Sequence, residues 1–423
     1  MPGPNLRVLQ KPALFAAVFF LSLWLCDRAL TLIGYPAPPV QSYTYPAHSK
    51  EVLQMVDHTF EYRSNDRGIR YRDLPLEKAP GEKRVVMIGD SFVEGEGVDL
   101  EQTFGALLEK KLSMPGRAVN FINCGISGTG PEEYIQVLSR VGLQYRPDRV
   151  LMVLYANDLA ETARTVPAST LIGDERPLTR WKAAVYDIFP KLYLLCRRFY
   201  ALHFSRFVPD VIRLTEYEAR SRDIPEDKIK RWADSLPPDI VKLANDGWID
   251  GNWLSAGLIY PEYWVENFDL TVGTNRSKWP LMALELDRIR ELCRSNGLEL
   301  AVAYAPHPYQ YDPHYSPVFE RAGLDVNKEW LTTETAFEKL IRGWTESRQV
   351  PFLNLTPVFQ RAAQASEEPL NFRLDQHWNP AGHRLAASAL YDWLTEKVWP
   401  DLKPSAREKI LSMDAKGSLP KIS

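Results

Sequence analysis

The feature that most constrains the fold is a repeated unit in which a short, wholly apolar run is followed by an amphipathic helical segment. The first run, RVVMIGDS, starts at Arg84, and the helical pattern TFGALLEKKL follows it from Thr103. Two further apolar runs start at Ala118 and Arg149, and two more, LELAVAYAP and VPFLNL, lie after residue 278. Strands that are apolar throughout and alternate with helices are typical of a parallel sheet covered by helices on both faces. The sequence therefore predicts an α/β fold with three layers, α/β/α, around a five-stranded parallel sheet.

The remaining segments of the chain differ from this pattern. Residues 161–278 carry many aromatic and charged side chains without the strand–helix rhythm, which predicts a mostly helical insertion. The stretch from Tyr35 to His48 is rich in Pro and Tyr, so it is interpreted as an extended linker. We therefore expect an N-terminal anchor or signal (1–34), a linker and N-terminal extension (35–82), the α/β domain in two parts (83–160 and 279–400) around the insertion (161–278), and a tail (401–423).

The composition excludes several classes of function. The chain has 51 Lys and Arg residues against 54 Asp and Glu residues, a formal net charge of -3. A nucleic-acid-binding protein would show a basic excess or a basic face, so no nucleic-acid partner is expected. The four cysteines, at positions 26, 124, 196 and 293, form no CxxC pair, so neither a metal site nor a disulfide framework is expected. A single bridge between Cys196 and Cys293 stays open.

The N-terminus has the pattern of an export signal or signal anchor. Arg7 and Lys11 precede the apolar run LFAAVFFLSLWLC, which Asp27 and Arg28 interrupt. The uninterrupted run is shorter than the roughly 20 residues of a transmembrane helix. No clear cleavage site follows it, so an uncleaved membrane anchor is favoured over a cleaved signal, with a buried core helix as the third alternative. Because the basic end of such a helix stays cytoplasmic, the rest of the chain is expected on the exported side of a bacterial-type membrane, or secreted.

Polar residues follow the predicted strands at the points where the strands end. Ser91 follows the first strand, Gly128 lies after the second, and Asn157 after the third. Asp375 and His377 lie after the fifth strand, just before the final helix. Ligands of parallel α/β sheets bind beyond the carboxyl ends of the strands, so these groups are expected to converge there. A hydroxyl, flexible backbone amides, a side-chain amide and an imidazole near a carboxylate are the groups that acyl transfer needs.

The four blocks that carry these residues resemble those of the SGNH (GDSL-like) hydrolase superfamily. GDSF matches the first block, with Ser91 in the nucleophile position, and NCGISG matches the second, with Gly128 in the glycine position. AND matches the third block through Asn157, although Ala156 stands where glycine is usual. DQHWN matches the last block, with His377 in the histidine position. The resemblance implies the SGNH version, similar to flavodoxin, of the predicted three-layer fold.

The resemblance also implies a role for each residue. Ser91 would attack an ester as nucleophile, His377 would be its base, and Asp375 would orient the imidazole. The backbone N–H groups of Ser91 and Gly128, with the side-chain amide of Asn157, would form the oxyanion hole. This chemistry needs neither a metal nor a cofactor.

The last block departs from the usual spacing. Many members of the superfamily have Asp three residues before the histidine, where this chain has Leu374, whereas Asp375 lies two residues before His377. The D-x-H-W form is similar to that of membrane-anchored SGNH-like proteins that acetylate or deacetylate bacterial polysaccharides. This spacing leaves the geometry between Asp375 and His377 open.

Other residues near the blocks have competing interpretations. Taken alone, Ser91 could simply cap a helix, since Ser is a favoured N-cap residue. His307, after the fourth strand, and Trp378 are candidates for substrate contact. Glu94 and Glu96, in FVEGEG, are interpreted as solvated loop residues.

Three functions are compatible with these motifs. The first is an exported serine esterase that hydrolyses acyl esters, such as O-acetyl groups on a small molecule or a glycan. The second is an O-acyltransferase that uses the same residues on an extracellular or periplasmic glycan, and the third is a catalytically silent glycan-binding module. The sequence predicts a membrane contact through the N-terminal helix and makes no prediction of the oligomeric state.

Overall fold

The computed structural model describes residues 6–32, 44–54, 58–162, 211–246, 251–270 and 275–404, and single residues at 185, 188, 189, 191, 192, 195 and 196. The chain divides into two compact units. One comprises Met1–Ser42 and Arg164–Tyr217, and the other comprises Tyr43–Ala163 and Glu218–Ser423. All the motif residues lie in the second unit.

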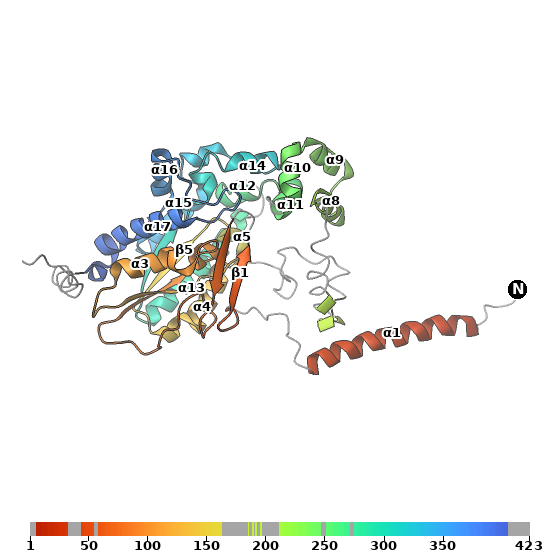
Figure 1. Ribbon diagram of the computed structural model, residues 1–423, viewed down its shortest axis with the longest axis horizontal. Helices are drawn as coiled ribbons and strands as arrows, with labels where there is room; N and C mark the ends of the chain where they lie inside the picture. Colours follow the sequence, from red (N-terminus) through yellow and green to blue (C-terminus); the bar gives the residue numbers. More distant parts are fainter. Residues whose placement is uncertain are drawn as a thin grey trace, which may run out of the picture. The chain divides into compact units, whose positions relative to one another are not determined.

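The second unit is built on a parallel sheet of five strands (Figure 1). The strands are β3 (Lys83–Ile88), β4 (Val119–Asn123), β5 (Arg149–Leu154), β6 (Glu299–Tyr304) and β7 (Phe352–Asn354). Their order across the sheet is β4-β3-β5-β6-β7, and every neighbouring pair is parallel. The order reverses direction at β3, so β3 lies between the two strands that follow it in sequence. The predicted five-stranded parallel sheet is confirmed. Four strands lie inside their predicted apolar runs, and β3 begins one residue before its run, at Lys83.

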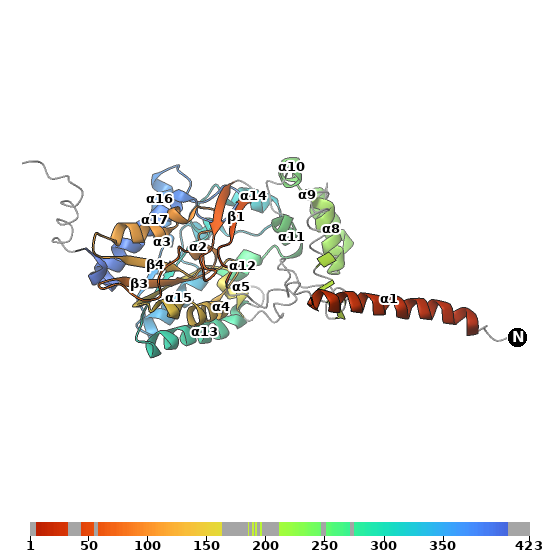
Figure 2. The ribbon, with the colours of Figure 1, turned by 60° about the horizontal axis from the view of Figure 1, so that its bottom comes forward.

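Both faces of the sheet are buried. Successive side chains of a strand point to opposite faces, and in β3 both sets belong to apolar clusters. In β3, Val85 and Met87 belong to one apolar cluster, whereas Val86 and Ile88 belong to another. Figure 2 shows helices α3 and α17 on one side of the strands and α4 and α13 on the other. These helices are α3 (Phe104–Leu112), α4 (Pro131–Arg140), α13 (Asn275–Ser295) and α17 (Pro380–Trp393). The predicted α/β/α layering is confirmed.

Further helices complete the second unit. The short helices near the sheet are α2 (Ser91–Glu94), α5 (Asp158–Glu161), α14 (Ser316–Arg321), α15 (Ala336–Ser347) and α16 (Thr356–Ala365). Within the predicted insertion lie α9 (Glu226–Ser235), α10 (Pro238–Asn245), α11 (Gly251–Ile259) and α12 (Tyr263–Phe268). Helix α8 (Val211–Ser221) also lies in the insertion, but its residues up to Tyr217 belong to the first unit. In the described parts of residues 211–270, every regular element is a helix.

The N-terminal extension contains a hairpin that the sequence analysis did not predict. Strands β1 (Lys50–Gln54) and β2 (Thr59–Arg63) pair as an antiparallel hairpin. Phe60 and Tyr62 on β2 are buried, while their neighbours Glu61 and Arg63 are more exposed. This alternation of buried and exposed side chains is typical of a half-buried strand.

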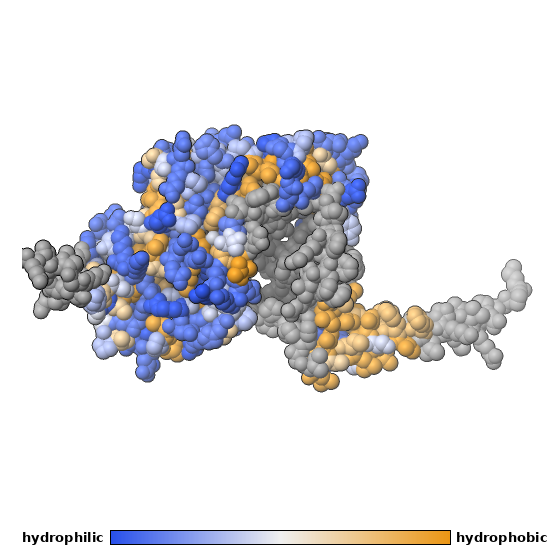
Figure 3. All heavy atoms as spheres, in the orientation of Figure 1, coloured by the Kyte–Doolittle hydropathy of each residue, from blue (hydrophilic) through white to orange (hydrophobic). Residues whose placement is uncertain are grey.

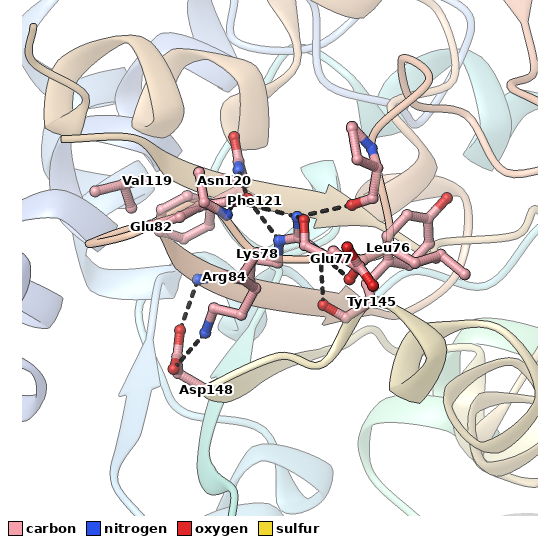
Figure 4. A network of polar contacts seen from close by, with 12 residues as sticks. Leu76, Glu77, Lys78, Glu82, Arg84, Val119, Asn120, Phe121, Tyr145 and Asp148 are labelled. Atoms are coloured by element: carbon pink, nitrogen blue, oxygen red, sulfur yellow. Dashed lines mark hydrogen bonds and ion pairs between the residues drawn. The ribbon is translucent and has the colours of Figure 1, made fainter. Parts of the chain in front are cut away.

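A buried arginine joins the extension to the amino end of the sheet. The fully buried Arg84 of β3 donates hydrogen bonds to the carbonyl oxygens of Leu76 and Tyr145, at 2.9 and 2.8 Å (Figure 4). Its guanidinium also pairs with Glu82 at 2.5 Å. A buried charge is tolerated when it is paired and hydrogen-bonded, so this network stabilises the edge of the sheet opposite the carboxyl ends of the strands.

In the first unit, helix α1 (Leu6–Leu32) carries exposed apolar side chains, among them Phe15, Phe20 and Leu25 (Figure 3). Within the described residues, no helix combines the length and the apolar character that are needed to cross a membrane. The four cysteines, all among the described residues, are free.

Candidate active site

Ser91 is the first residue of helix α2 and follows strand β3 after a turn of two residues, Gly89 and Asp90. Asp90 caps this helix, because its carboxylate accepts a hydrogen bond from the backbone N–H of Phe92 at 3.0 Å. The turn is tight at Gly89, where an added Cβ would lie 2.3 Å from Val93 and 2.8 Å from the carbonyl oxygen of Val153. The strand therefore ends in a sharp turn that holds the serine at the carboxyl edge of the sheet.

His377 lies against Ser91. The distance between His377 Nε2 and Ser91 Oγ is 2.7 Å, although the two residues are 286 positions apart in sequence. The other ring nitrogen, Nδ1, lies 2.5 Å from Asp375 Oδ1, and the backbone N–H of His377 donates to the same oxygen at 2.8 Å. With Nδ1 donating to the carboxylate, Nε2 of the neutral ring is free to accept the Ser91 proton.

The charges around the imidazole change its proton affinity. Burial alone would lower the pKa of His377, but the charges of Asp375 and Glu96 outweigh burial and raise the pKa to about 10. Burial would also raise the pKa of Asp375, yet the charge and hydrogen bonds of His377 outweigh it and lower that pKa. The site therefore favours the imidazolium form that arises when the ring takes a proton.

The sheet order places the two predicted oxyanion residues on either side of the serine. Gly128 lies in the loop after β4 and Asn157 directly after β5, and these are the two strands that neighbour β3. Gly128 has φ +68°, and a Cβ built there would meet no heavy atom within 4 Å, so its backbone faces open space. The side-chain oxygen of Asn157 is buried without a hydrogen-bond partner. The same loops thus bring Gly128 and Asn157 to the edge that carries Ser91.

Glu94 is part of the site and is not a solvated loop residue as the sequence suggested. It is only 3% exposed, and its carboxylate accepts a hydrogen bond from the backbone N–H of Ser127 at 3.0 Å. Burial, with the charge of Glu96, raises the pKa of Glu94 to about 7. Because Ser127 precedes Gly128, this bond ties the predicted oxyanion loop to the helix that begins with the nucleophile.

Glu96 also differs from its interpretation as a solvated residue. Its Oε2 lies 3.8 Å from His377 Nε2, and its side chain is 19% exposed. The hydroxyl of Ser127 donates to the same Oε2 at 2.7 Å. A carboxylate therefore stands beside the ring nitrogen that faces the nucleophile.

Arg70 holds the loop that carries these two acids, a role that the sequence did not indicate. Its side chain is fully buried. It donates hydrogen bonds to the carbonyl oxygens of Glu61, Glu94, Gly95 and Val98. His58, in the same N-terminal extension, stacks on Phe372 with the ring centres 3.6 Å apart. The extension thus contacts both the loop after the nucleophile and the loop before the histidine.

The structure does not bring the two predicted substrate contacts to the surface of the site. Trp378 is 1% exposed and packs in the core against Phe92 and Phe359. His307 is also 1% exposed; its ring lies 4.0 Å from the Trp264 ring, between centres, and burial lowers its pKa well below the ordinary value. The interpretation of both residues as substrate contacts is therefore corrected. Their rings are packed in the core beside the site.

Ser91, His377 and Asp375 are arranged for nucleophilic catalysis by the serine hydroxyl. A hydroxyl, an imidazole and a carboxylate form one hydrogen-bonded row, which is the arrangement that activates a serine. Among the described residues, no group of three or more His, Cys, Asp or Glu side chains is placed to hold a metal ion.

Comparison with known families gives two matches along the chain. Residues 85–224 match the family model of the GDSL-like lipase/acylhydrolases. Residues 277–419 match the family model described as "SGNH hydrolase-like domain, acetyltransferase AlgX". Ser91, Gly128 and Asn157 lie in the first range, and Asp375 and His377 lie in the second. A search of curated proteins found no match.

The solved structures that match this chain have low sequence identity to it. One is the psychrotrophic esterase EstA from Pseudoalteromonas sp., at 12% identity and a TM-score of 0.35, where the match covers 75% of this chain and 99% of that one. Another is a mutant of Axe2, an acetyl-xylooligosaccharide esterase from Geobacillus Stearmophilus, at 10% identity and a TM-score of 0.35, covering 76% and 97%.

Proposed function

Because the chain belongs to the SGNH hydrolase superfamily and is an ester-bond hydrolase of the GDSL type, we propose that it cleaves acyl esters through Ser91. The observation that carries this proposal is the row Ser91–His377–Asp375, with contacts of 2.7 and 2.5 Å. The same row argues against a catalytically silent binding module, because a module that only binds has no need of an aligned nucleophile and base.

The reaction proceeds in two steps. Ser91 Oγ forms a bond to the acyl carbon while its proton passes to His377 Nε2, and the bond between the acyl carbon and the alcohol oxygen then breaks. His377 gives the proton to the departing alcohol. Water next attacks the acyl-enzyme, with His377 as base, and releases the carboxylic acid and free Ser91.

Each remaining site residue stabilises charge that appears during these steps. Asp375 holds the ring with Nδ1–H directed at it and stabilises the imidazolium. The N–H groups of Ser91 and Gly128 and the side-chain N–H group of Asn157 donate to the oxyanion, and such donors act strongly because they are preorganised. Glu94 keeps the Gly128 loop in position through Ser127.

Acyl transfer to another hydroxyl is the second candidate. The match of residues 277–419 to a family named for an acetyltransferase favours it. In this reaction a sugar hydroxyl, instead of water, attacks the acyl-enzyme, and His377 takes its proton. The same residues serve both reactions.

For the natural setting, we propose O-acyl groups of an exported glycan or small molecule as substrate. The basic flank and apolar run of the N-terminus support export, with α1 as signal or anchor. The exposed apolar side chains of α1 support burial of this helix in a lipid interface.

Turnover of p-nitrophenyl acetate by the full chain tests the proposed function. We expect hydrolysis by the unsubstituted protein and loss of nearly all of it in Ser91→Ala and His377→Ala. Adding a sugar acceptor and measuring acetylated sugar by mass spectrometry separates transfer from hydrolysis. An unsubstituted protein that neither hydrolyses nor transfers acetyl groups would overturn the proposal.

A further inference from the structure

We propose that Glu96 selects esters whose alcohol part carries a free hydroxyl group on the carbon adjacent to the one that bears the ester oxygen, as partly acylated sugars do. The inference rests on the proposed function, because it assigns a substrate class to the same site. It makes Glu96 a specificity-determining residue that accepts a hydrogen bond from the alcohol part of the substrate.

The position of Glu96 relative to His377 is the first support. Its Oε2 lies 3.8 Å from Nε2, the atom that passes the proton to the departing alcohol oxygen. The alcohol oxygen must come within about 3 Å of Nε2 to receive that proton. The carbon that bears this oxygen, and a hydroxyl group on the adjacent carbon, are therefore brought close to the Glu96 carboxylate.

The chemistry of the carboxylate is the second support. An ionised carboxylate is an acceptor only, with about four lone-pair positions on its two oxygens. Ser127 Oγ supplies one donor to Oε2, at 2.7 Å. A neutral hydroxyl group of the substrate is a matching donor, whereas an anionic group would be repelled by Glu96.

The third support is that backbone hydrogen bonds hold Glu96 at the residue that carries the nucleophile. The N–H groups of Gly95 and Glu96 both donate to the carbonyl oxygen of Ser91, at 2.8 and 3.0 Å. Arg70 holds the Gly95 carbonyl from the other side. The carboxylate therefore keeps a set distance from the reacting serine, which selection between substrates requires.

Glu96 also affects His377, and the two effects can be separated. Its charge favours the imidazolium, so its removal changes the reaction of every ester alike. A hydrogen bond to the substrate acts only on esters that have the hydroxyl group. The ratio of kcat/KM between two esters cancels the first effect and keeps the second.

The experiment compares 2-hydroxyethyl acetate with 2-methoxyethyl acetate, which has no donor at the same position. The full chain, Glu96→Gln, Glu96→Ala and Glu101→Gln are measured, and each ratio of kcat/KM is divided by the ratio of the hydroxide-catalysed rates. Glu101 is an exposed carboxylate of the following turn (Leu100–Gln102) and is the matched control.

We expect the full chain and Glu101→Gln to prefer the hydroxyethyl ester by about tenfold, the size of a hydrogen bond to a charged acceptor. The preference should shrink in Glu96→Gln, which keeps a weaker acceptor, and vanish in Glu96→Ala. A full chain without preference, or a preference that survives in Glu96→Ala, would overturn the inference while leaving the esterase in place. Failure to cleave either ester, by hydrolysis or by acetyl transfer to an added sugar, would instead contradict the proposed function.

Discussion

Asp375 and His377 are joined through a single carboxylate oxygen, which accepts hydrogen bonds from both the ring Nδ1 and the backbone N–H of His377, at 2.5 and 2.8 Å. Two residues of separation are therefore enough for the orienting contact. The backbone bond closes a short turn that an Asp side chain forms readily with the amide two residues on. Leu374, which stands where many relatives have the acid, is buried instead.

The pH dependence of kcat/KM should report this contact. Only neutral His377 can take the Ser91 proton, and its pKa is raised to about 10, so activity should rise with pH from 7 toward 10. In Asp375→Asn the charge that raises the pKa is removed, so the rise should move to lower pH. The limiting rate should fall by about ten-thousandfold, as expected when the imidazole loses its orienting carboxylate. A pH profile that is the same in both proteins would contradict the assignment of Asp375.

Asn157→Ala should lower kcat with little change in KM. A donor that stabilises mainly the oxyanion acts in the transition state, and its loss typically costs about 10²–10³ in kcat. Steady-state kinetics with p-nitrophenyl acetate measure the effect. Asn296→Ala is the control, because Asn296 is exposed in the loop before β6, at the opposite edge of the sheet. A raised KM with unchanged kcat would assign Asn157 to ground-state binding only.

Gly128→Ala should reduce activity far more than Gly116→Ala. Both glycines have positive φ, +68° and +79°, and an added Cβ meets no atom within 4 Å at either position. Both variants therefore carry a similar backbone strain of about 1 kcal/mol, but only Gly128 lies in the loop beside Ser91. Melting temperatures should fall equally, while kcat falls only in Gly128→Ala. Equal activities would remove Gly128 from the oxyanion hole.

Arg70→Lys should destabilise the protein although it keeps the charge. A lysine cannot reproduce the planar set of donors that reaches the carbonyl oxygens of Glu94, Gly95 and Val98. Leaving such buried groups unpaired should lower the free energy of unfolding by about 2–4 kcal/mol. Urea denaturation measures this change, with Arg63→Lys, at an exposed position of strand β2 in the same N-terminal extension, as control. If Arg70→Lys is as stable as the control, the extension does not hold the loop.

Much of the fold and the row of catalytic candidates could be predicted from the sequence. The strands are apolar on both faces and therefore appear as continuous runs, and the ends of parallel strands share an edge. The positions of Ser91, Asn157 and His377 after their strands therefore predict that they converge. The hairpin of β1 and β2 was missed, although the alternation of Phe60 and Tyr62 with polar neighbours was a usable signal.

The residues around that row could not be predicted, for physical reasons. Arg70 donates to backbone carbonyl oxygens. Every residue type has this group, so the sequence does not show which residues are its partners. Glu94 and Glu96 lie in a Gly-rich stretch that has the composition of an exposed turn, and only the folded chain brings them to Ser127 and His377. Trp378 follows the histidine in sequence, but its side chain packs into the core, beneath the site.

The central claim is that Ser91 is the nucleophile, and covalent labelling tests it most directly. The full chain is treated with a fluorophosphonate ester at neutral pH, and the adduct is located by peptide mass spectrometry. We predict one adduct per chain, at Ser91, absent in Ser91→Ala and formed far more slowly in His377→Ala. An adduct on another residue, or equal labelling of Ser91→Ala, would contradict the account.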